Sequence, residues 1–288
     1  MDRGLRQIFE PESAKAEEFL TQLAALEPHL CVTVAYGNFL PSRFLGIPQF
    51  GTLNIHPSLL PQFRGAAPVP RALEQGLLRS GVTVAFTVLA MDAGPVVRQV
   101  ETDIDPDEQA PELLARLMRL GTEQLLRELP GVWTGEAARG ANPQNETSPP
   151  GVSHAAKMEK SDGVLDFAST PGSELHNKVR AYAGWPGTSA TLVQIVEGGA
   201  QKEEEEVPLK VIRTTAAFGF RGITLGPPTH GSNLYPVEMG KDALVVPCQG
   251  GSSTLHITEV QVPGKKVMTA QAFANGIKSK KAKLFVKC

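Results

Sequence analysis

An asparagine and a histidine lie two positions apart in the stretch TLNIHPSLLP, residues 52–61. Side chains alternate between the two faces of a strand, so Asn54 and His56 are expected on one face, where both can meet one substrate. Pro57 keeps His56 extended and has no N–H for a neighbouring strand, which predicts that the strand ends there, at the carboxyl edge of its sheet. In open α/β sheets ligands bind at that edge. Capping of a loop by two polar side chains is the alternative interpretation.

A histidine that acts as a base needs a partner that orients its ring and raises its basicity. Asp92 is the candidate, because it lies in the loop AMDAGPVV directly after another expected strand. An Asp that closes an Asx turn fits the same local sequence. The segment SLLPQFRGAAP, which follows His56, is irregular and proline-rich, with an apolar stretch and free backbone groups that could line a pocket for a flat organic ring.

Alternating helices and strands are expected to position these residues. Apolar periodicity and β-branched runs predict strands at 31–37, 52–56, 81–89 and 96–104, and helices at 13–26, 68–76 and 111–129, with a short helix near SRFLG. This order predicts an α/β fold with a partly parallel sheet, in the manner of a Rossmann-like domain.

The residue composition of the sequence changes after about residue 131. The stretch ARGANPQNETSPPGVSH is rich in Pro, Asn, Ser and Gly and is typical of a linker. Short β-rich stretches such as TSATLVQIV and STLHITEVQV follow it and predict a small antiparallel domain, either an OB-like β-barrel or a sandwich. We therefore expect a catalytic α/β domain at 1–135, a linker at 136–157 and a β domain at 158–288.

Composition limits the possible functions. The chain has 288 residues, 41% hydrophobic and 20% charged, which is typical of a globular protein with two domains. No apolar run approaches the roughly 20 residues of a membrane span, and the first residues form neither a signal peptide nor a transit peptide. The cysteines, Cys31, Cys248 and Cys288, are too widely separated for a disulfide framework or a metal cluster, which favours a reducing compartment.

Charge is distributed unevenly along the chain. The net charge is −2, yet the part that follows Pro263 has no acidic residue and contains Lys265, Lys266, Lys278, Lys280, Lys281, Lys283 and Lys287. Such a segment can bind an anionic polymer by releasing its counterions, and a solvated basic terminus is the alternative. The KEEEE run at 202–206 is expected at a hairpin tip.

The motifs AYGNFLP, NIHPSLLPQFRGAAPV, GVTVAFTV and MDAGPVV, in this order and spacing, resemble those of the methionyl-tRNA formyltransferases. The resemblance runs from about residue 10 to near the end. The pattern NxHxSLLP is shared by the wider group of enzymes that transfer a formyl group from 10-formyltetrahydrofolate. The motif RGAAPV narrows this group of enzymes toward those that act on methionyl-tRNA. The motifs KVRAYAGWPGT and VQVPGKK in the second domain narrow it further.

The resemblance implies specific roles for site residues. It makes Asn54, His56 and Asp92 a catalytic trio, in which the histidine takes the proton of the attacking amine, the asparagine binds the developing oxyanion and the aspartate holds the imidazole. It implies a folate-binding segment at Ser58, Leu59, Leu60 and Pro61. Arg64 could contact phosphate or the folate tail, and the alternative is an arginine that caps a surface loop. No metal site is predicted.

The resemblance also implies partners. They are 10-formyltetrahydrofolate and methionyl initiator tRNA, the latter with candidate contacts at Lys178, Arg180, Lys265 and Lys266, and the protein is expected to be a monomer with no membrane association. Two alternatives remain open. One is a formyltransferase for a small amine, and the other is an inactive paralogue that only binds tRNA.

The sequence departs from the family pattern in two places. Around Asp92, Met91, Ala93 and Pro95 replace common residues in a way that resembles organellar enzymes of plants and green algae, so a mitochondrion or plastid is expected, with a bacterial cytoplasm as the alternative. The family's first domain has earlier strands, and their absence would leave one side of CVTVAYG unpaired. An incomplete gene model or fragment is the expected explanation, and a shortened paralogue is the alternative.

Overall fold

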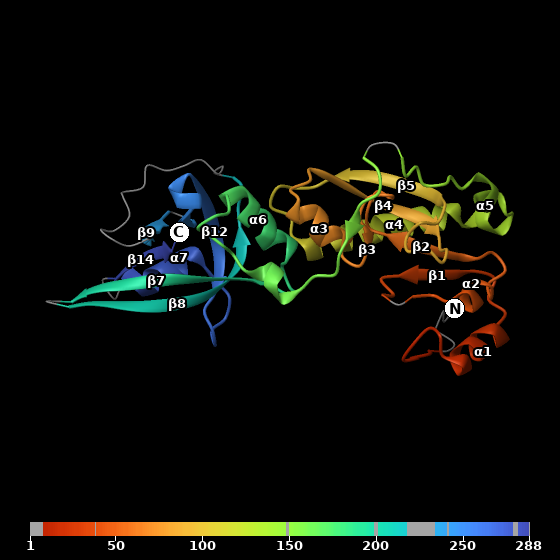
Figure 1. Ribbon diagram of the computed structural model, residues 1–288, viewed down its shortest axis with the longest axis horizontal. Coiled ribbons are helices and arrows are strands. Elements are labelled where there is room, and N and C mark those ends of the chain that lie inside the picture. The colour runs from red at the N-terminus through yellow and green to blue at the C-terminus, as the bar shows by residue number, and fades with distance from the viewer. Residues whose placement is uncertain are drawn as a thin grey trace, which may run out of the picture. The chain divides into compact units, whose positions relative to one another are not determined.

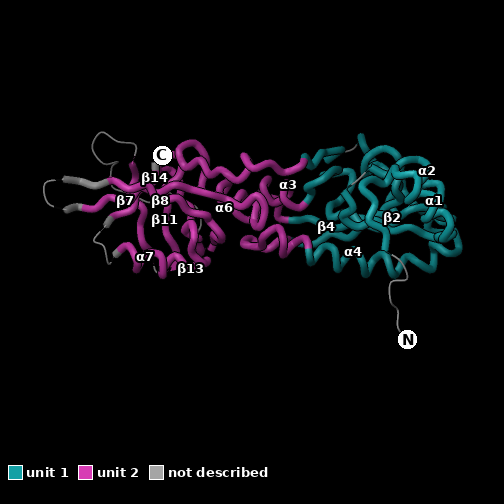
Figure 2. Tube along the Cα trace, turned by 90° about the horizontal axis from the view of Figure 1, so that it is seen from below, with its two compact units in different colours: residues 1–68, 79–103, 115–156 teal, residues 69–78, 104–114, 157–288 magenta. Residues whose placement is uncertain are grey.

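The computed structural model describes residues 8–37, 39–147, 150–198, 201–217, 234–240, 242–278 and 282–287. They form two compact units, coloured separately in Figure 2. The first unit comprises residues 1–68, 79–103 and 115–156, and the second comprises 69–78, 104–114 and 157–288. The domain boundaries expected from the sequence, at 135 and 157, stay a prediction.

A four-stranded mixed sheet organises the first unit (Figure 1). Its strands follow the order β1 (Cys31–Val34), β2 (Thr52–His56), β4 (Arg79–Phe86) and β5 (Val96–Asp103). The pair β1–β2 is parallel, whereas β4 is antiparallel to both β2 and β5. The α/β fold with a partly parallel sheet is therefore confirmed.

The described part of the chain contains the helices α1 (Glu17–Ala25), α2 (Ser42–Leu45), α3 (Pro68–Glu74), α4 (Ala110–Trp133), α5 (Glu136–Gly140), α6 (Gly172–Ala181) and α7 (Ala270–Lys278). Short 3₁₀ turns lie at η1 (Lys160–Gly163) and η2 (Gln249–Gly251). Every helix that the structure describes is too short or too polar to cross a lipid bilayer.

The long helix α4 presses against the middle of the first sheet. Gly121 makes this approach possible, because a Cβ at that position would lie 2.5 Å from Cγ2 of Ile55 and 2.7 Å from Cγ2 of Val82. Leu53 and Ile55 are buried in this contact, and each contributes about 1.5–3 kcal/mol by leaving water. Their burial fixes β2, so the intervening Asn54 and the final His56 are directed to the other face.

Strand β1 lies at the edge of this sheet. Within the described ranges no strand pairs with its outer side. Val32 and Val34 are 43% and 48% exposed and alternate with half-buried neighbours. This is the unpaired apolar edge expected from the sequence.

An antiparallel, nearly closed β-barrel forms the second unit and confirms the predicted small barrel. Its strands follow the order β10 (Glu238–Met239), β11 (Leu244–Cys248), β12 (Ser253–Gln261), β8 (Gln201–Thr214), β7 (Thr188–Gly198), β14 (Ala282–Lys287) and β9 (Leu234–Pro236), and β13 (Met268–Thr269) pairs with β12. Leu192, Val246 and Leu255 are among the buried side chains that fill it. The KEEEE run forms part of strand β8 and not only a hairpin tip.

A third, two-stranded sheet joins β3 (Arg64–Gly65) to β6 (His154–Ala155) in parallel. Strand β6 belongs to the stretch 136–157 that the sequence predicts as a linker. The same stretch contains α5 and an antiparallel bridge between Asn142 and Val96. Residues 142–147 and 150–155, which we call the return segment, are thus hydrogen-bonded at several points to the rest of the first unit.

Candidate active site

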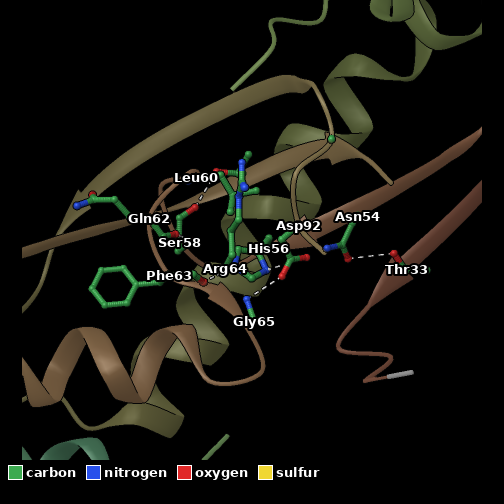
Figure 3. A network of polar contacts seen from close by, with 12 residues as sticks. Thr33, Asn54, His56, Ser58, Leu60, Gln62, Phe63, Arg64, Gly65 and Asp92 are labelled. Carbon is green, nitrogen blue, oxygen red and sulfur yellow. Dashed lines mark hydrogen bonds and ion pairs between the residues drawn. The ribbon is translucent and has the colours of Figure 1, made fainter. Parts of the chain in front are cut away.

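His56 ends strand β2 and is only 5% exposed. Its Nε2 lies 2.9 Å from the carbonyl oxygen of Phe63. A carbonyl can only accept, so Nε2 carries a hydrogen and, in the neutral ring, Nδ1 carries the lone pair. Nδ1 faces Oδ1 of Asp92 at 3.8 Å, as Figure 3 shows. Nδ1 is therefore the basic atom that the site presents.

The carbonyl of Phe63, and not Asp92, orients the imidazole. The sequence predicts that Asp92 holds the ring, but 3.8 Å is too long for a direct hydrogen bond. Phe63 has a left-handed backbone with φ of 56°, which costs about 1–3 kcal/mol in a bulky residue and is common at functional sites. That conformation accompanies a carbonyl aimed at His56. Asp92 remains well placed to stabilise a positive charge on the ring.

Asn54 is held by a neighbour that the sequence analysis missed. Thr33 lies opposite Asn54 in the β1–β2 register, and its Oγ1 donates to Oδ1 of Asn54 at 3.0 Å. The amide nitrogen then points away from Thr33 and toward Asp92 (Figure 3). With its oxygen engaged, the amide of Asn54 presents N–H donors to the site. In the sequence, the contact could have been suspected only from two polar residues that lie on strands expected to be adjacent.

Asp92 is held from two sides. Its Oδ2 accepts from the backbone N–H of Gly65 at 2.8 Å, and its carbonyl accepts from Nε2 of Gln144 at 2.7 Å. Asp92 adopts φ of 50°, and Gly65 adopts φ of 122°. A Cβ on Gly65 would lie 2.8 Å from the carbonyl oxygen of Ala155, so a side chain there would separate β3 from β6.

The predicted folate-binding segment, residues 58–61, is braced by Thr83 and Gln99. Oγ1 of Thr83 donates to the carbonyl of Ser58 at 2.7 Å and accepts from the N–H of Leu60 at 3.2 Å. Nε2 of Gln99 lies 3.0 Å from the carbonyl of Leu60 and 2.9 Å from Oγ1 of Thr83. These contacts fix the path of the segment beside His56.

The members of that segment have different surroundings. Leu60 lines the pocket described below. The buried Ser58 donates its hydroxyl to the carbonyl of Gln62 at 2.7 Å, so this hydroxyl shapes the turn. Leu59 packs beside Gly81, where a Cβ would lie 2.4 Å from its Cδ2, and Pro61 is half-buried.

A pocket lies among the predicted catalytic side chains. Its walls are Asn54, Leu60, Ala85, Phe86, Thr87, Val88, Asp92 and Gly94. The pocket is small and partly open to solvent, far below the roughly 300–1,000 Å³ of a site that encloses a whole drug-sized ligand, so only part of a substrate can enter it. The hydroxyl oxygen of Thr87 is buried there without a hydrogen-bond partner among the described residues. An unpaired polar atom in an apolar wall suits a ligand with polar edges.

The predicted tRNA contacts also differ from one another. Lys265 and Lys266 are exposed in the turn between β12 and β13, where a polyanion could reach both. Nζ of Lys178 donates to the carbonyl of Val164 at 3.3 Å. Lys280 and Lys281 of the basic terminus lie outside the described residues.

Arg180 is poorly placed for a phosphate contact. It is 4% exposed, and its guanidinium donates to Oδ1 of Asn177 at 3.0 Å and to the carbonyl of Asp105 at 3.4 Å. Burial lowers the pKa of this guanidinium. The side chain therefore serves packing within the second unit in this structure.

Sequence profiles assign the chain to a class. The profile described as "Formyl transferase" matches residues 3–129, and the one described as "Formyl transferase, C-terminal domain" matches residues 157–278. The chain therefore belongs to the formyl transferase family.

Within that family the chain is similar to bacterial proteins named methionyl-tRNA formyltransferase. It is 38% identical over 279 residues to the one from Methylococcus capsulatus, a match that covers 96% of this chain and 80% of that protein. The match to the one from Trichlorobacter lovleyi is 33% identical over 269 residues and covers 93% and 76%. The organellar location expected from the loop sequence stays a prediction.

Solved structures support the fold. HypX from Aquifex aeolicus in complex with tetrahydrofolic acid matches with a TM-score of 0.56 and 18% identity over 90% of this chain and 41% of that longer one. The sugar 3N-formyl transferase WlaRD matches with a TM-score of 0.56 and 14% identity over 85% and 77%. At these identities the likeness establishes the architecture alone.

Proposed function

We propose that this chain transfers the formyl group of 10-formyltetrahydrofolate to the α-amine of methionyl initiator tRNA. The observation that carries the proposal is the convergence of Asn54, His56 and Asp92 at one site, with Asn54 and Asp92 in the wall of a single pocket and His56 facing Asp92. These three provide an oxyanion donor, a base and a carboxylate, which are the groups that acyl transfer to an amine requires.

The geometry suggests how each residue acts. Nδ1 of His56, directly or through a water, takes the proton that the amine loses as it bonds to the formyl carbon. The bond between Nε2 and the carbonyl of Phe63 keeps Nδ1 directed to the site throughout. Asp92, 3.8 Å away, stabilises the imidazolium, which then returns the proton to the folate nitrogen as the carbon–nitrogen bond breaks.

Asn54 acts on the formyl oxygen. Its amide N–H donates more strongly as negative charge grows on that oxygen, an effect typically worth about 3 kcal/mol of transition-state stabilisation. Thr33 makes this possible because it engages the amide oxygen.

The choice of acceptor rests on two observations. The similar proteins that match most of this chain bear the name methionyl-tRNA formyltransferase. The second unit also exposes Lys265 and Lys266 in one turn. A small-amine acceptor would need no basic turn. Counterion release at a phosphate chain gives that turn a use.

The test is formylation of methionyl initiator tRNA with 10-formyltetrahydrofolate. We expect His56→Ala and Asn54→Ala to fold and to lower kcat about 100-fold or more, because both residues act on the transition state. His56→Ala also removes a buried side chain, so its thermal midpoint should fall by a few degrees. His29→Ala removes an exposed histidine of the same unit and serves as the control. Wild-type turnover in either site variant would sink the proposal, as would transfer to a small amine but not to the tRNA.

A further inference from the structure

Gln144, in the return segment, uses every polar group of its side chain. Its Nε2 donates to the carbonyl of Asp92 at 2.7 Å and to the carbonyl of Gly94 at 2.9 Å. Its Oε1 accepts from Nε of Arg64 at 3.0 Å and also from Nη2 of the same guanidinium. The side chain thus bridges the loop of the proposed catalytic carboxylate to strand β3.

Arg64 fixes the position of that amide. The residue is 7% exposed, and its Nη2 pairs with Oε1 of Glu146 at 2.7 Å. A buried guanidinium must keep its acceptors, because leaving its N–H groups unpaired is unfavourable. Its backbone N–H also donates to the carbonyl of Ser153 at 2.9 Å, within the β3–β6 pairing. The oxygen of Gln144 is therefore held by a group that cannot easily move.

The loop that Gln144 grips needs support. Asp92 occupies the left-handed region with φ of 50°, which a non-glycine residue adopts only when its surroundings hold it there. Gln144 binds the main chain of the loop, while the N–H of Gly65 binds the carboxylate at 2.8 Å. Arg64, which holds Gln144, precedes Gly65 in β3, so one short strand anchors both supports.

We propose that Gln144 is a positioning residue for the transfer reaction. It holds the loop so that the carboxylate of Asp92 lies beside Nδ1 of His56. The inference rests on the proposed function, because it takes Asp92 to stabilise the protonated imidazole. It adds a role for a segment outside the motifs that define the site in the sequence.

The first test compares Gln144→Glu with Gln49→Glu, which makes the same change at an exposed glutamine of the same unit. The carboxylate of the Gln144→Glu variant still accepts from Arg64. It has no N–H groups to donate to the carbonyls of Asp92 and Gly94, and its negative charge faces those oxygens. We expect kcat to fall about 10- to 100-fold, with KM for both substrates within about twofold and the thermal midpoint within a few degrees. Gln49→Glu leaves the bridge intact and should keep kcat within about twofold. Gln144→Met is the second variant and should behave as Gln144→Glu does.

The second test needs no turnover. Hydrogen exchange of the Gly65 amide, which donates to Asp92, should accelerate about tenfold or more in Gln144→Glu and stay unchanged in Gln49→Glu. The amide of Val84, in the middle of β4, should exchange alike in all variants. Wild-type kcat and wild-type Gly65 exchange in Gln144→Glu would overturn the inference, as would faster exchange throughout the first unit.

Asp92→Asn separates the two proposals. If this variant keeps wild-type kcat, the proposed role of Asp92 fails, and Gly65 exchange still decides whether Gln144 holds the loop. If Asp92→Asn loses activity while Gln144→Glu keeps it, the positioning inference alone fails.

Discussion

Thr33 determines which atom of Asn54 faces the pocket. Its hydroxyl lies 3.0 Å from Oδ1 of Asn54 and 3.3 Å from the carbonyl of Leu53. We predict that Thr33→Val, which keeps the shape and removes the hydroxyl, lowers kcat roughly 3- to 10-fold at unchanged KM, because a net hydrogen bond is worth about 1 kcal/mol. Steady-state formylation kinetics measure this. Thr33→Ser keeps the hydroxyl and should retain activity, and equal kcat in the Val and Ser variants would contradict the assignment.

Part of the site follows from residue types and spacing alone. Strand alternation predicts that Asn54 and His56 share a face, and Pro57 predicts the strand end, since both depend on local geometry. The carbonyl of Phe63, which accepts the hydrogen bond of His56, could not be predicted in this way. A backbone carbonyl has no residue type of its own, and the left-handed conformation of Phe63 has no glycine to indicate it.

At the scale of elements, α6 contains a buried titratable group that the proposed reaction does not use. Nδ1 of His176 lies 2.7 Å from Oγ1 of Thr214, and its Nε2 lies 2.9 Å from the carbonyl oxygen of Pro106. Burial lowers the pKa of this imidazole, nearby Arg180 lowers it further, and the Pro106 carbonyl and Asp107 oppose the shift. The neutral form is therefore the one that packs between α6, β8 and the 105–107 turn.

A pH dependence of stability follows from His176. The unfolded chain takes up a proton near pH 6.5 while the folded one resists it, so the free energy of unfolding should be fully retained above about pH 6.5 and fall as the pH drops below it. Denaturant titrations of the wild type and His176→Gln from pH 7.5 to 5.5 measure this. The variant should lose less stability over that range, and parallel curves would rule out the assignment.

The return segment shows why some elements escape sequence-based prediction. Its proline- and asparagine-rich composition has neither helical nor strand periodicity, which indicates a linker. Its order comes instead from single contacts, such as the backbone N–H of Phe63 with Oγ of Ser153 at 2.9 Å and the bonds of Gln144. Contacts of this kind depend on residues that are distant in the sequence.

For the whole molecule, the order of an α/β unit and a barrel follows from alternating patterns. The same patterns do not predict that residues 69–78 and 104–114 belong to the second unit. It depends on side chains such as Arg71, which pairs with Oδ2 of Asp162 at 2.8 Å and donates to the hydroxyl of Tyr182 at 2.7 Å. Nothing in the local sequence around Arg71 indicates partners about 90 or more positions away.

The basic turn of the barrel allows a test of tRNA binding by the complete chain. We predict that replacing Lys265 and Lys266 with Glu weakens tRNA binding about tenfold or more at low salt. The slope of log K against log salt should flatten by up to about 2, because each lost phosphate contact removes about 0.9. Filter binding across a salt series measures both quantities. The exposed Lys157 and Lys160, replaced in the same way, match the charge change, and an equal loss in both double variants would argue against a specific turn.

The pairing of β3 with β6 has a consequence for the order in which the molecule matures. Phe63 and Ser153 are 90 positions apart, so during synthesis Phe63 and Asp92 leave the ribosome well before Ser153 and Gln144, which hold their main chain. Closing so long a loop is only slightly less favourable than closing one of half the length, by about 0.6 kcal/mol, but it cannot happen until the later residues have emerged. A nascent chain would therefore hold the loop of Asp92 less firmly until the return segment docks. We expect the proposed site to reach its final geometry only after residues up to 155 have emerged.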